Sequence, residues 1–366
     1  MEHSVRHVAK RVLIYRLGSL GDMLIALPAL RLIERAFPDA ERRMLTSVPP
    51  NAKAAPAAQV LDKTGLIHGF FAYPYGTRNP FKLLHLIWQI RRWKPDVAIY
   101  LNGERTLRAA RRDAQFLRFC GVRQQIGVPV TAEMRDHQLR KTSAGLEIFE
   151  PEAERLTRNL ALLGPAQMER QENWSIQLDA DELGQAAAAL EPLQGAPFIA
   201  VSMGTKLQAN DWGLENWSEL LSQLAERYPD HALVITGAAP EASAAESILA
   251  AWRAHSLRPA INFCGALSVR QSAAVYAHGS VFIGHDSGPL HLAAAAGTQC
   301  VGIFGARNLP GVWFPQGSQH CVLYHRVDCM GCGLEVCTLE QKKCILSITV
   351  GEVLSALEST IRAQPR

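Results

Sequence analysis

Several features that would define a function class are missing from this 366-residue sequence. No run of eighteen uncharged apolar residues occurs, so we expect no membrane-spanning helix. The opening residues, MEHSVRHVAKRVLIYRLG, have neither a long apolar region nor a small-residue cleavage site, so we expect no signal peptide and a cytoplasmic location. Short internal repeats and low-complexity tracts are missing as well. With 48% hydrophobic and 20% charged residues, the composition is that of a soluble globular protein.

The common nucleotide-binding fingerprints are missing too. There is no G-x-x-x-x-G-K loop, so the sequence has no Walker motif. After the first apolar run, Gly18 and Gly21 give only G-x-x-G, a poor match to the G-x-G-x-x-G of nicotinamide-dependent dehydrogenases. Two large classes of nucleotide-binding enzyme are therefore not favoured.

Acidic residues are scarce in the first half. Residues 1–165 contain 26 Lys and Arg against 15 Asp and Glu, whereas residues 166–366 contain 12 against 19. The net charge of +4 is therefore the sum of a basic first half and an acidic second half. Either the first half meets an anionic partner, or its arginines form an ordinary solvated surface. Nothing beyond these arginines favours nucleic-acid binding.

Apolar runs alternate with helical patterns along the chain. Val12–Tyr15 has the pattern of a buried strand and is followed by a helix from Asp22 to about Ala36. The stretch 163–197 is polar and contains Gly and Pro, so we expect the link between two domains within it. A second series of strands and helices then begins. This alternation predicts a parallel α/β sheet in each domain, with ligands at the carboxyl ends of the strands.

The stretch FIGHDSGPLHLAAAAGTQCVGIFG, residues 282–305, is the most informative. A strand ends at Asp286, Ser287 and Gly288 form a turn, and a helix follows with His291 one turn inside it. The N–H groups at such a helix start favour an anion, and Gly288 allows a ligand to approach the backbone. The alternative is a simple helix cap with a surface histidine.

Two further loops carry candidate residues. In SMGTKLQANDW, residues 202–212, Thr205 and Lys206 follow a strand and suit a phosphate group. In RLGSLGDMLIALPAL, residues 16–30, Asp22 stands at the mouth of a helix. It is either a helix cap or a catalytic base in an open cleft.

In this order and spacing, the three stretches resemble glycosyltransferase family 9, the family of the ADP-heptose:lipopolysaccharide heptosyltransferases. The resemblance implies the GT-B architecture, with two Rossmann-like doubly wound domains facing a central cleft. Residues 1–170 would form the acceptor domain and residues 171–346 the nucleotide-sugar domain. Residues 347–366 contain an amphipathic helix, which Ser347 or Thr349 caps, and we expect this helix to pack back toward the first domain.

The resemblance also implies roles for individual residues. Asp22 falls on the general base of the family, with Arg16 and Gly21 beside it on the acceptor side. The donor diphosphate would meet a set of residues from the two anion loops: Thr205, Lys206, Asp286, Ser287, Gly288 and His291. Glu241 would contact the nucleoside and Leu267 would line the adenine pocket. The donor would be a nucleotide sugar, with ADP-heptose the leading candidate, and we expect neither a cofactor nor a metal ion at the diphosphate.

One position departs from the family pattern. Many members have a lysine two residues before the tryptophan, whereas this sequence has Asn210 in NDW. An asparagine donates a hydrogen bond but does not neutralise a phosphate. The sequence therefore does not decide whether the donor and its affinity match those of the heptosyltransferases.

Arginines crowd one segment of the basic half. The spacing of Arg105, Arg108 and Arg112 is compatible with one helix face. That face either binds an anionic, lipid-linked oligosaccharide acceptor at the cytoplasmic side of the inner membrane, or is simply solvated. The expected activity is inverting sugar transfer to lipopolysaccharide inner core or a related cell-surface glycan. The alternatives are a nucleotide-sugar epimerase and a non-catalytic nucleotide-sugar-binding partner in glycan assembly.

Half of the eight cysteines form one cluster, in CMGCGLEVCTLEQKKC, at Cys329, Cys332, Cys337 and Cys344. A C-x-x-C with two further cysteines is compatible with a Cys₄ zinc or iron–sulfur site. The second pair is not C-x-x-C, so reduced thiols that pack a loop are the competing interpretation.

Overall fold

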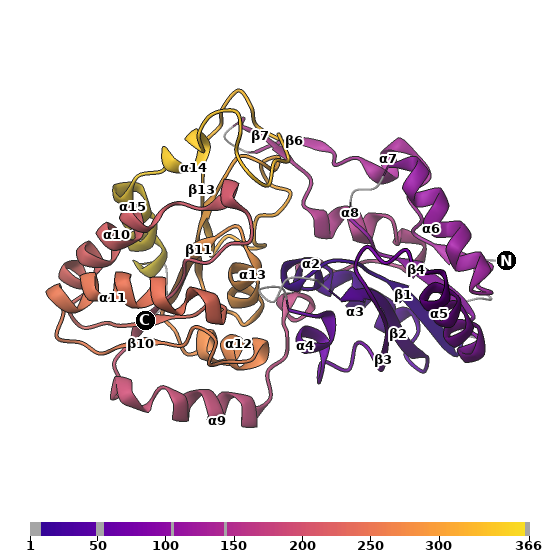
Figure 1. Ribbon diagram of the computed structural model, residues 1–366, viewed down its shortest axis with the longest axis horizontal. Helices are drawn as coiled ribbons and strands as arrows, with labels where there is room; N and C mark the ends of the chain where they lie inside the picture. The colour runs from indigo at the N-terminus through magenta and orange to yellow at the C-terminus, as the bar shows by residue number, and fades with distance from the viewer. Residues whose placement is uncertain (1–8, 49–54, 104–105, 143–144, 363–366) are drawn as a thin grey trace. The chain divides into compact units, whose positions relative to one another are not determined.

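Strands and helices alternate along both halves of the chain, as the sequence predicts (Figure 1). The computed structural model describes residues 9–48, 55–103, 106–142 and 145–362. It divides into two units, Met1–Ile176 and Gln177–Arg366, whereas the sequence placed the boundary between residues 170 and 171. Within the described residues, no helix combines the length and apolar content that a bilayer crossing requires.

The first unit is built on a parallel sheet in the order β3-β2-β1-β4-β5. Its strands are β1 (Arg11–Tyr15), β2 (Glu41–Val48), β3 (Gly69–Pro74), β4 (Val97–Tyr100) and β5 (Gln124–Ile126). Its helices are α2 (Leu20–Ile25), α3 (Leu27–Ala36), α4 (Ala57–Leu61), α5 (Pro80–Trp93), α6 (Leu107–Phe119), α7 (Ala132–Arg135) and α8 (Glu152–Arg158). An antiparallel pair, β6 (Leu139–Lys141) and β7 (Glu147–Phe149), lies outside the sheet.

The predicted helix from Asp22 to Ala36 is wrong as a single element. It divides into α2 and α3 at Ala26, and Pro28 lies in the first turn of α3. Proline has no N–H to donate and is tolerated in the first turn of a helix, so it starts a new helix here. Asp22 therefore lies on the short helix α2, which is separate from α3 and close to the carboxyl end of β1.

The second unit repeats this topology with an added strand, in the order β10-β9-β8-β11-β12-β13. Its strands are β8 (Phe198–Ser202), β9 (Ala232–Ile235), β10 (Ala260–Asn262), β11 (Val281–His285), β12 (Cys300–Phe304) and β13 (Cys321–Tyr324). Its helices are α9 (Ala180–Ala189), α10 (Leu214–Arg227), α11 (Ala242–His255), α12 (Val269–Ala277), α13 (Gly288–Ala295), α14 (Lys343–Leu346) and α15 (Val350–Arg362).

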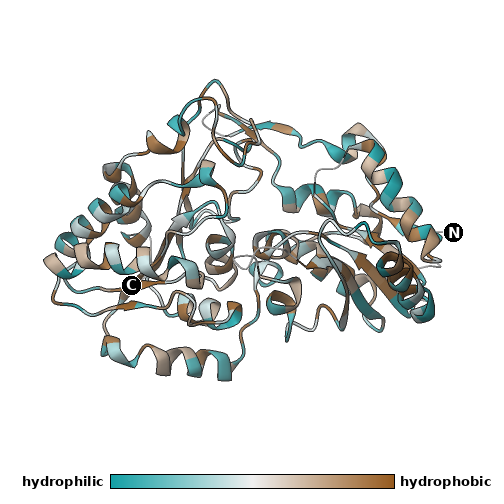
Figure 2. Cartoon of the chain, viewed as in Figure 1, coloured by the Kyte–Doolittle hydropathy of each residue, from teal (hydrophilic) through white to brown (hydrophobic). Residues whose placement is uncertain are grey.

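The central strands of both sheets are buried and mainly apolar, namely β1 and β4 in the first unit and β8, β9, β11 and β12 in the second (Figure 2). In the second unit α10, α11 and α15 pack together on one face, whereas α9, α12 and α13 pack together on the other. Thr349 caps α15, because its Oγ1 accepts the N–H of Glu352 at 3.2 Å. The terminal helix, which the sequence set apart, packs on α10 and on β11, β12 and β13 and so forms part of the second unit.

The strand order identifies where ligands bind in each unit. Successive strands are added on one side of β1 up to β3 and on the other side from β4 onward, so the strand order reverses between β1 and β4. In the second unit the same reversal lies between β8 and β11. Loops that leave two such strands diverge, and ligands bind in the crevice between them at the carboxyl ends. Asp22 lies in α2, which follows β1, and the loops after β8 and β11 contain Lys206 and Asp286.

Candidate functional site

Asp22 lies in the first turn of α2, immediately beyond the carboxyl end of β1. Its Oδ2 accepts the N–H of Ser19 at 2.8 Å, so the carboxylate caps its own helix. The side chain is nevertheless 33% exposed. Gly18 makes this packing feasible, since a Cβ there would lie 2.3 Å from Cγ of Asp22. The two readings of Asp22 are therefore compatible, because one oxygen caps the helix while the carboxylate remains accessible.

Arg16 is fully buried beneath this helix. Its Nε and Nη2 donate to the carbonyl oxygen of Asp22 at 3.2 and 2.6 Å, and Nη1 donates to the carbonyl oxygen of Leu101. Burial lowers the pKa of Arg16, and the nearby charges of Asp22 and Glu152 act against that shift. We expected Arg16 on the acceptor side; its guanidinium instead fastens α2 to the end of β4.

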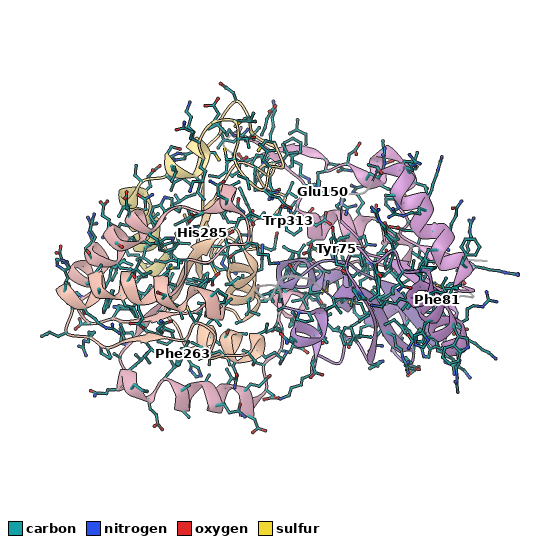
Figure 3. All side chains as sticks on the ribbon, viewed as in Figure 1. Tyr75, Phe81, Glu150, Phe263, His285 and Trp313 are labelled. Atoms are coloured by element: carbon teal, nitrogen blue, oxygen red, sulfur yellow. The ribbon has the colours of Figure 1, made fainter. Side chains whose placement is uncertain are left out.

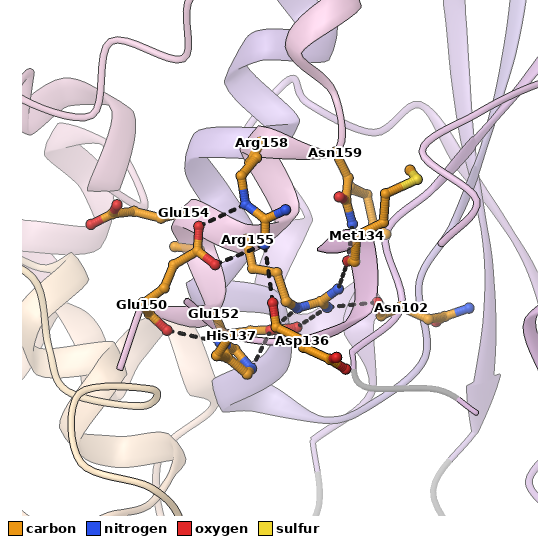
Figure 4. Close-up of polar contacts among 12 residues, drawn as sticks. Asn102, Met134, Asp136, His137, Glu150, Glu152, Glu154, Arg155, Arg158 and Asn159 are labelled. Carbon is orange, nitrogen blue, oxygen red and sulfur yellow. Dashed lines mark hydrogen bonds and ion pairs between the residues drawn. The ribbon is translucent and has the colours of Figure 1, made fainter. Parts of the chain in front are cut away.

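Arg16 contacts Glu152, which belongs to a buried ionic network. Figure 4 shows the part of this network around Glu152 and Arg155. Nη1 of Arg16 lies 3.8 Å from Oε1 of Glu152, and Glu152 accepts two hydrogen bonds from Arg155 at 2.7 and 2.8 Å. His137 lies 3.5 Å from the same carboxylate, and Nη2 of Arg155 donates to the carbonyl oxygen of Asn102. Paired and hydrogen-bonded in this way, the buried charges hold the loops after β1 and β4 in one geometry.

The other residues predicted to bind the acceptor that the structure describes lie on α2 and α6. Gly21 lies in the first turn of α2, one residue before Asp22. Arg105 lies outside the described residues, and Arg108 is exposed near the start of α6. Arg112 is exposed as well, and its guanidinium donates to the buried carboxylate of Asp113 at 3.0 Å. That hydrogen bond raises the pKa of Arg112, so this arginine stays cationic on the surface.

In the second unit, Asp286 is the first residue after β11, and its side chain is only 8% exposed. Its Oδ2 accepts from Nδ2 of Asn308 at 3.1 Å, and its carbonyl oxygen accepts from Nδ2 of Asn210 at 3.2 Å. Burial raises the pKa of Asp286 to about 6. Asn210 thus has a structural use: it ties the loop after β8 to the loop after β11.

The next residues form the start of α13. Ser287 is the N-cap residue, and its buried Oγ has no hydrogen-bond partner within the described structure. His291 lies one turn inside, with Nε2 4.0 Å from Oδ1 of Asp286 and its ring edge-on to Trp313. Burial lowers the pKa of His291 to about 4, so its ring is neutral at pH 7. An unpaired hydroxyl beside the N–H groups of a helix start is suited to a phosphate oxygen.

The residues predicted to contact the nucleoside, Glu241 and Leu267, lie near a place where loops pack closely through glycines. A Cβ on Gly204 would lie 2.2 Å from the carboxylate of Glu241, and one on Gly237 would lie 2.4 Å from it. A Cβ on Gly265 would lie 2.7 Å from Ala239, so the turn before Leu267 packs against the segment that precedes Glu241. Glu241 also accepts the N–H of Ala238 at 2.8 Å. Glycines are required at these positions because a carboxylate or a backbone segment takes the place of a side chain.

The loop after β8 contains Thr205 and Lys206, which differ in exposure. Lys206 is exposed, whereas Oγ1 of Thr205 turns back to the backbone N–H of Leu207 at 3.2 Å. In the first unit, Gly21 and Asp22 follow β1 at the switch point. In the second unit, Thr205 and Lys206 follow β8 and the residues from Asp286 to His291 follow β11, so these lie at the switch point, whereas Glu241 and Leu267 follow β9 and β10.

Sequence reasoning missed three supporting residues, Gly18, Asn308 and Glu152. Gly18 had a signal, since a glycine four residues before an acid in a turn provides room for that acid. Asn308 and Glu152 had none, because their partners Asp286 and Arg16 are distant in the sequence.

The comparisons with known proteins agree with this geometry. A profile described as glycosyltransferase family 9 (heptosyltransferase) matches residues 86–343. A search of curated protein sequences finds no significant match. The solved structure of the glycosyl transferase family 9 protein from Veillonella parvula DSM 2008 gives a TM-score of 0.72 at 17% identity, covering 97% of this chain and 98% of that chain.

Two E. coli structures are also similar. ADP-heptose lps heptosyltransferase II gives a TM-score of 0.66 at 17% identity, covering 96% of this chain and 98% of that chain. Heptosyltransferase WaaC, solved with ADP, gives 0.57 at 18% identity, covering 96% and 98%. At such identities the likeness establishes the fold, and the predicted class of two Rossmann-like α/β domains is confirmed.

Proposed function

This chain belongs to glycosyltransferase family 9, and from that premise we propose that it is an inverting glycosyltransferase that uses a nucleotide sugar. The leading donor is ADP-heptose, and the leading acceptor is lipopolysaccharide inner core or a related cell-surface glycan. The E. coli neighbours, one named for ADP-heptose and one solved with ADP, support this choice of donor.

The proposed reaction is a single displacement at the anomeric carbon. Asp22 takes the proton of the acceptor hydroxyl, the oxygen attacks the sugar carbon, and the nucleoside diphosphate leaves. The leaving group gains negative charge, which the N–H groups at the start of α13, the hydroxyl of Ser287 and the ammonium of Lys206 stabilise. Glu241 and the turn at Leu267 hold the nucleoside.

The exposure of the Asp22 carboxylate carries this proposal. One carboxylate oxygen is fixed by Ser19, whereas Oδ1 is 3.9 Å from the nearest Arg16 nitrogen, beyond hydrogen-bonding distance. A base must be held in place and still reach its substrate, and the Asp22 carboxylate meets both conditions.

We propose further that the first unit meets an anionic, membrane-anchored acceptor at the cytoplasmic face of the inner membrane. One face of α5 is buried through Leu86, Ile90 and Trp93, while Phe81 and Trp88 on the other face are 80% and 53% exposed (Figure 3). Basic residues flank these aromatic side chains on the same helix: Lys82, Arg91 and Arg92. An exposed apolar stripe with cations beside it suits an anionic lipid surface, and Arg108 and Arg112 provide cations on α6.

The decisive experiment combines a donor panel with variants of Asp22. Binding of ADP-, UDP- and GDP-linked sugars is measured by calorimetry, and product formation with lipid A–core fractions by mass spectrometry. We expect the ADP-linked sugar to bind most tightly and to be transferred. Asp22→Asn should abolish transfer while leaving donor affinity unchanged, whereas Asp39→Asn, at an exposed acid in the same unit, should behave as wild type.

The two alternative functions, a nucleotide-sugar epimerase and a non-catalytic nucleotide-sugar-binding partner, predict different results. Turnover of the donor without any acceptor would indicate an epimerase. Donor binding without turnover on any acceptor fraction would indicate a binding partner, and full activity of Asp22→Asn would remove the base assignment.

A further inference from the structure

An open groove of about 610 Å³ lies at the edge of the first sheet, where α5 packs against β3 (Figure 1). β3 is the last strand on its side of that sheet, two strands away from β1 and its switch point. The groove is lined by Arg43 of β2, by Arg92 of α5 and by the rings of Phe71, Trp88 and Trp93. Two guanidinium groups and three aromatic rings thus meet in a groove that the proposed transfer reaction does not use.

Aromatic rings hold both guanidinium groups in place. The guanidinium carbon of Arg43 lies 5.0 Å from the ring centre of Trp93 and 5.6 Å from that of Phe71. The guanidinium carbon of Arg92 lies 5.3 Å from the ring centre of Trp88. A guanidinium that stacks on a ring keeps the N–H groups at its edge available, and it loses less freedom when it binds an anion.

The two arginines differ in how their charge is compensated. Glu41 accepts from Nε of Arg43 at 2.7 Å and from Nε1 of Trp93 at 2.8 Å, so the charge of Arg43 is compensated by a carboxylate. Arg92 is exposed and has no carboxylate partner within the part of the chain that the structure describes. Arg92 therefore supplies the uncompensated charge of the groove.

The chain around the groove is cationic. No Asp or Glu occurs in the 33 residues from 63 to 95, which include β3 and α5. The same stretch contains these cations: Lys63, Arg78, Lys82, Arg91, Arg92 and Lys94. Trp88 belongs both to the groove and to the exposed aromatic stripe of α5 that includes Phe81. An anionic surface that meets the stripe therefore meets the groove as well.

We propose that this groove binds the phosphate group of an anionic lipid headgroup, with Arg92 as the main donor and Arg43 beside it. The inference rests on the membrane contact proposed for α5. A planar guanidinium donates two parallel hydrogen bonds to a phosphate, which an ammonium does not. Continuity with the stripe favours a lipid over a free phosphate ester, because the aromatic side chains enter the interface beside the headgroup.

Vesicle sedimentation tests the groove without any acceptor glycan. The wild-type chain should bind phosphatidylcholine vesicles that contain phosphatidylglycerol more tightly than vesicles given the same surface charge by a fatty acid. Arg92→Lys keeps the charge but removes the paired donors, so it should weaken binding to the phosphatidylglycerol vesicles by about tenfold. Arg91→Lys is the matched control and should bind as wild type, because Arg91 is exposed on the same helix but is not among the residues that line the groove.

A second variant should act in the opposite direction. Glu41→Gln removes the charge that compensates Arg43 and keeps an oxygen that accepts from Trp93, so it should strengthen binding to phosphatidylglycerol vesicles by about fivefold. Asp62→Asn removes an exposed acid of the same unit outside the groove, and it should leave binding unchanged. Thermal melts verify that each variant is folded.

Several results would overturn the proposal. Equal binding of wild type and Arg92→Lys, or equal binding to phosphate and fatty-acid vesicles, would refute the headgroup site and leave the membrane contact of α5 in place. Glycerol phosphate that binds as tightly as the vesicles would indicate a site for a free phosphate ester. A wild-type chain that binds no vesicle would refute both the site and the contact. These measurements involve neither donor nor transfer, so the groove and the proposed sugar transfer are refuted by different results.

Discussion

Replacing Gly18 with alanine tests the assignment of Asp22 through geometry alone, because the carboxylate itself is kept. A Cβ on Gly18 would lie 2.3 Å from Cγ of Asp22 and 2.5 Å from its Oδ2, whereas ordinary contact begins at 3.4 Å. The carboxylate must therefore move by roughly 1 Å, which at a general base lowers turnover by about 100-fold, or about 2.7 kcal/mol.

The same substitution also strains the backbone. Gly18 has a φ of +123°, which an alanine adopts only at a cost of about 1–3 kcal/mol. Gly65→Ala separates the two effects, since Gly65 lies in the same unit at φ +70° and a Cβ there meets nothing within 4 Å. We expect both variants to melt below wild type and only Gly18→Ala to lose turnover.

The assay follows release of the nucleoside diphosphate at saturating donor and acceptor, with donor affinity measured by calorimetry. Donor affinity should be equal in wild type and in both variants, because the residues proposed to bind the donor belong to the second unit. If folded Gly18→Ala turns over within about twofold of Gly65→Ala, Asp22 is not the base and the reasoning is refuted.

Three further predictions concern charge and surface. Because burial raises the pKa of Asp286 to about 6, this group contributes most to stability below pH 4, and about 3 kcal/mol is lost as the pH rises through 6; urea unfolding of Asp286→Asn should lack that dependence. Arg270 donates to buried Glu182 at 2.5 and 2.7 Å and lowers the pKa of Glu182, so Arg270→Ala should cost about 3–5 kcal/mol at pH 7. In urea melts that cost should shrink as the pH falls through the pKa of Glu182 in the folded chain, because the carboxylate that Arg270 stabilises is then protonated. Phe81→Ser with Trp88→Ser should weaken sedimentation with anionic vesicles and leave transfer to a detergent-dispersed acceptor unchanged; equal vesicle binding would remove α5 from the membrane surface.

Local sequence patterns predicted much of the framework. The alternation of apolar runs and helices gave two parallel-sheet domains, and Val12–Tyr15 falls within β1. Thr349 was one of two expected caps for the terminal helix, and it is the one that hydrogen-bonds. These features depend on residues within a few positions of one another, so periodicity and capping rules detect them.

The missed features depend on contacts between distant segments. The burial of Arg16 follows from its contacts with Leu101 and Glu152, and nothing local distinguishes this arginine from a surface one. The break between α2 and α3 did have a local signal in Pro28, but the apolar periodicity runs through it. Asn210 appeared as a lost phosphate contact, and its hydrogen bond to Asp286 became evident only in three dimensions.

The boundary between Ile176 and Gln177 has a consequence for how this protein can be altered. The contacts described for Asp22 come from residues before that boundary, and those described for Asp286 come from residues after it. A chimera that joins residues 1–176 to the second half of another family member should keep its acceptor preference and take its donor preference from the new half. Under the proposed function, a change of sugar donor would require substitutions only among residues 177–366.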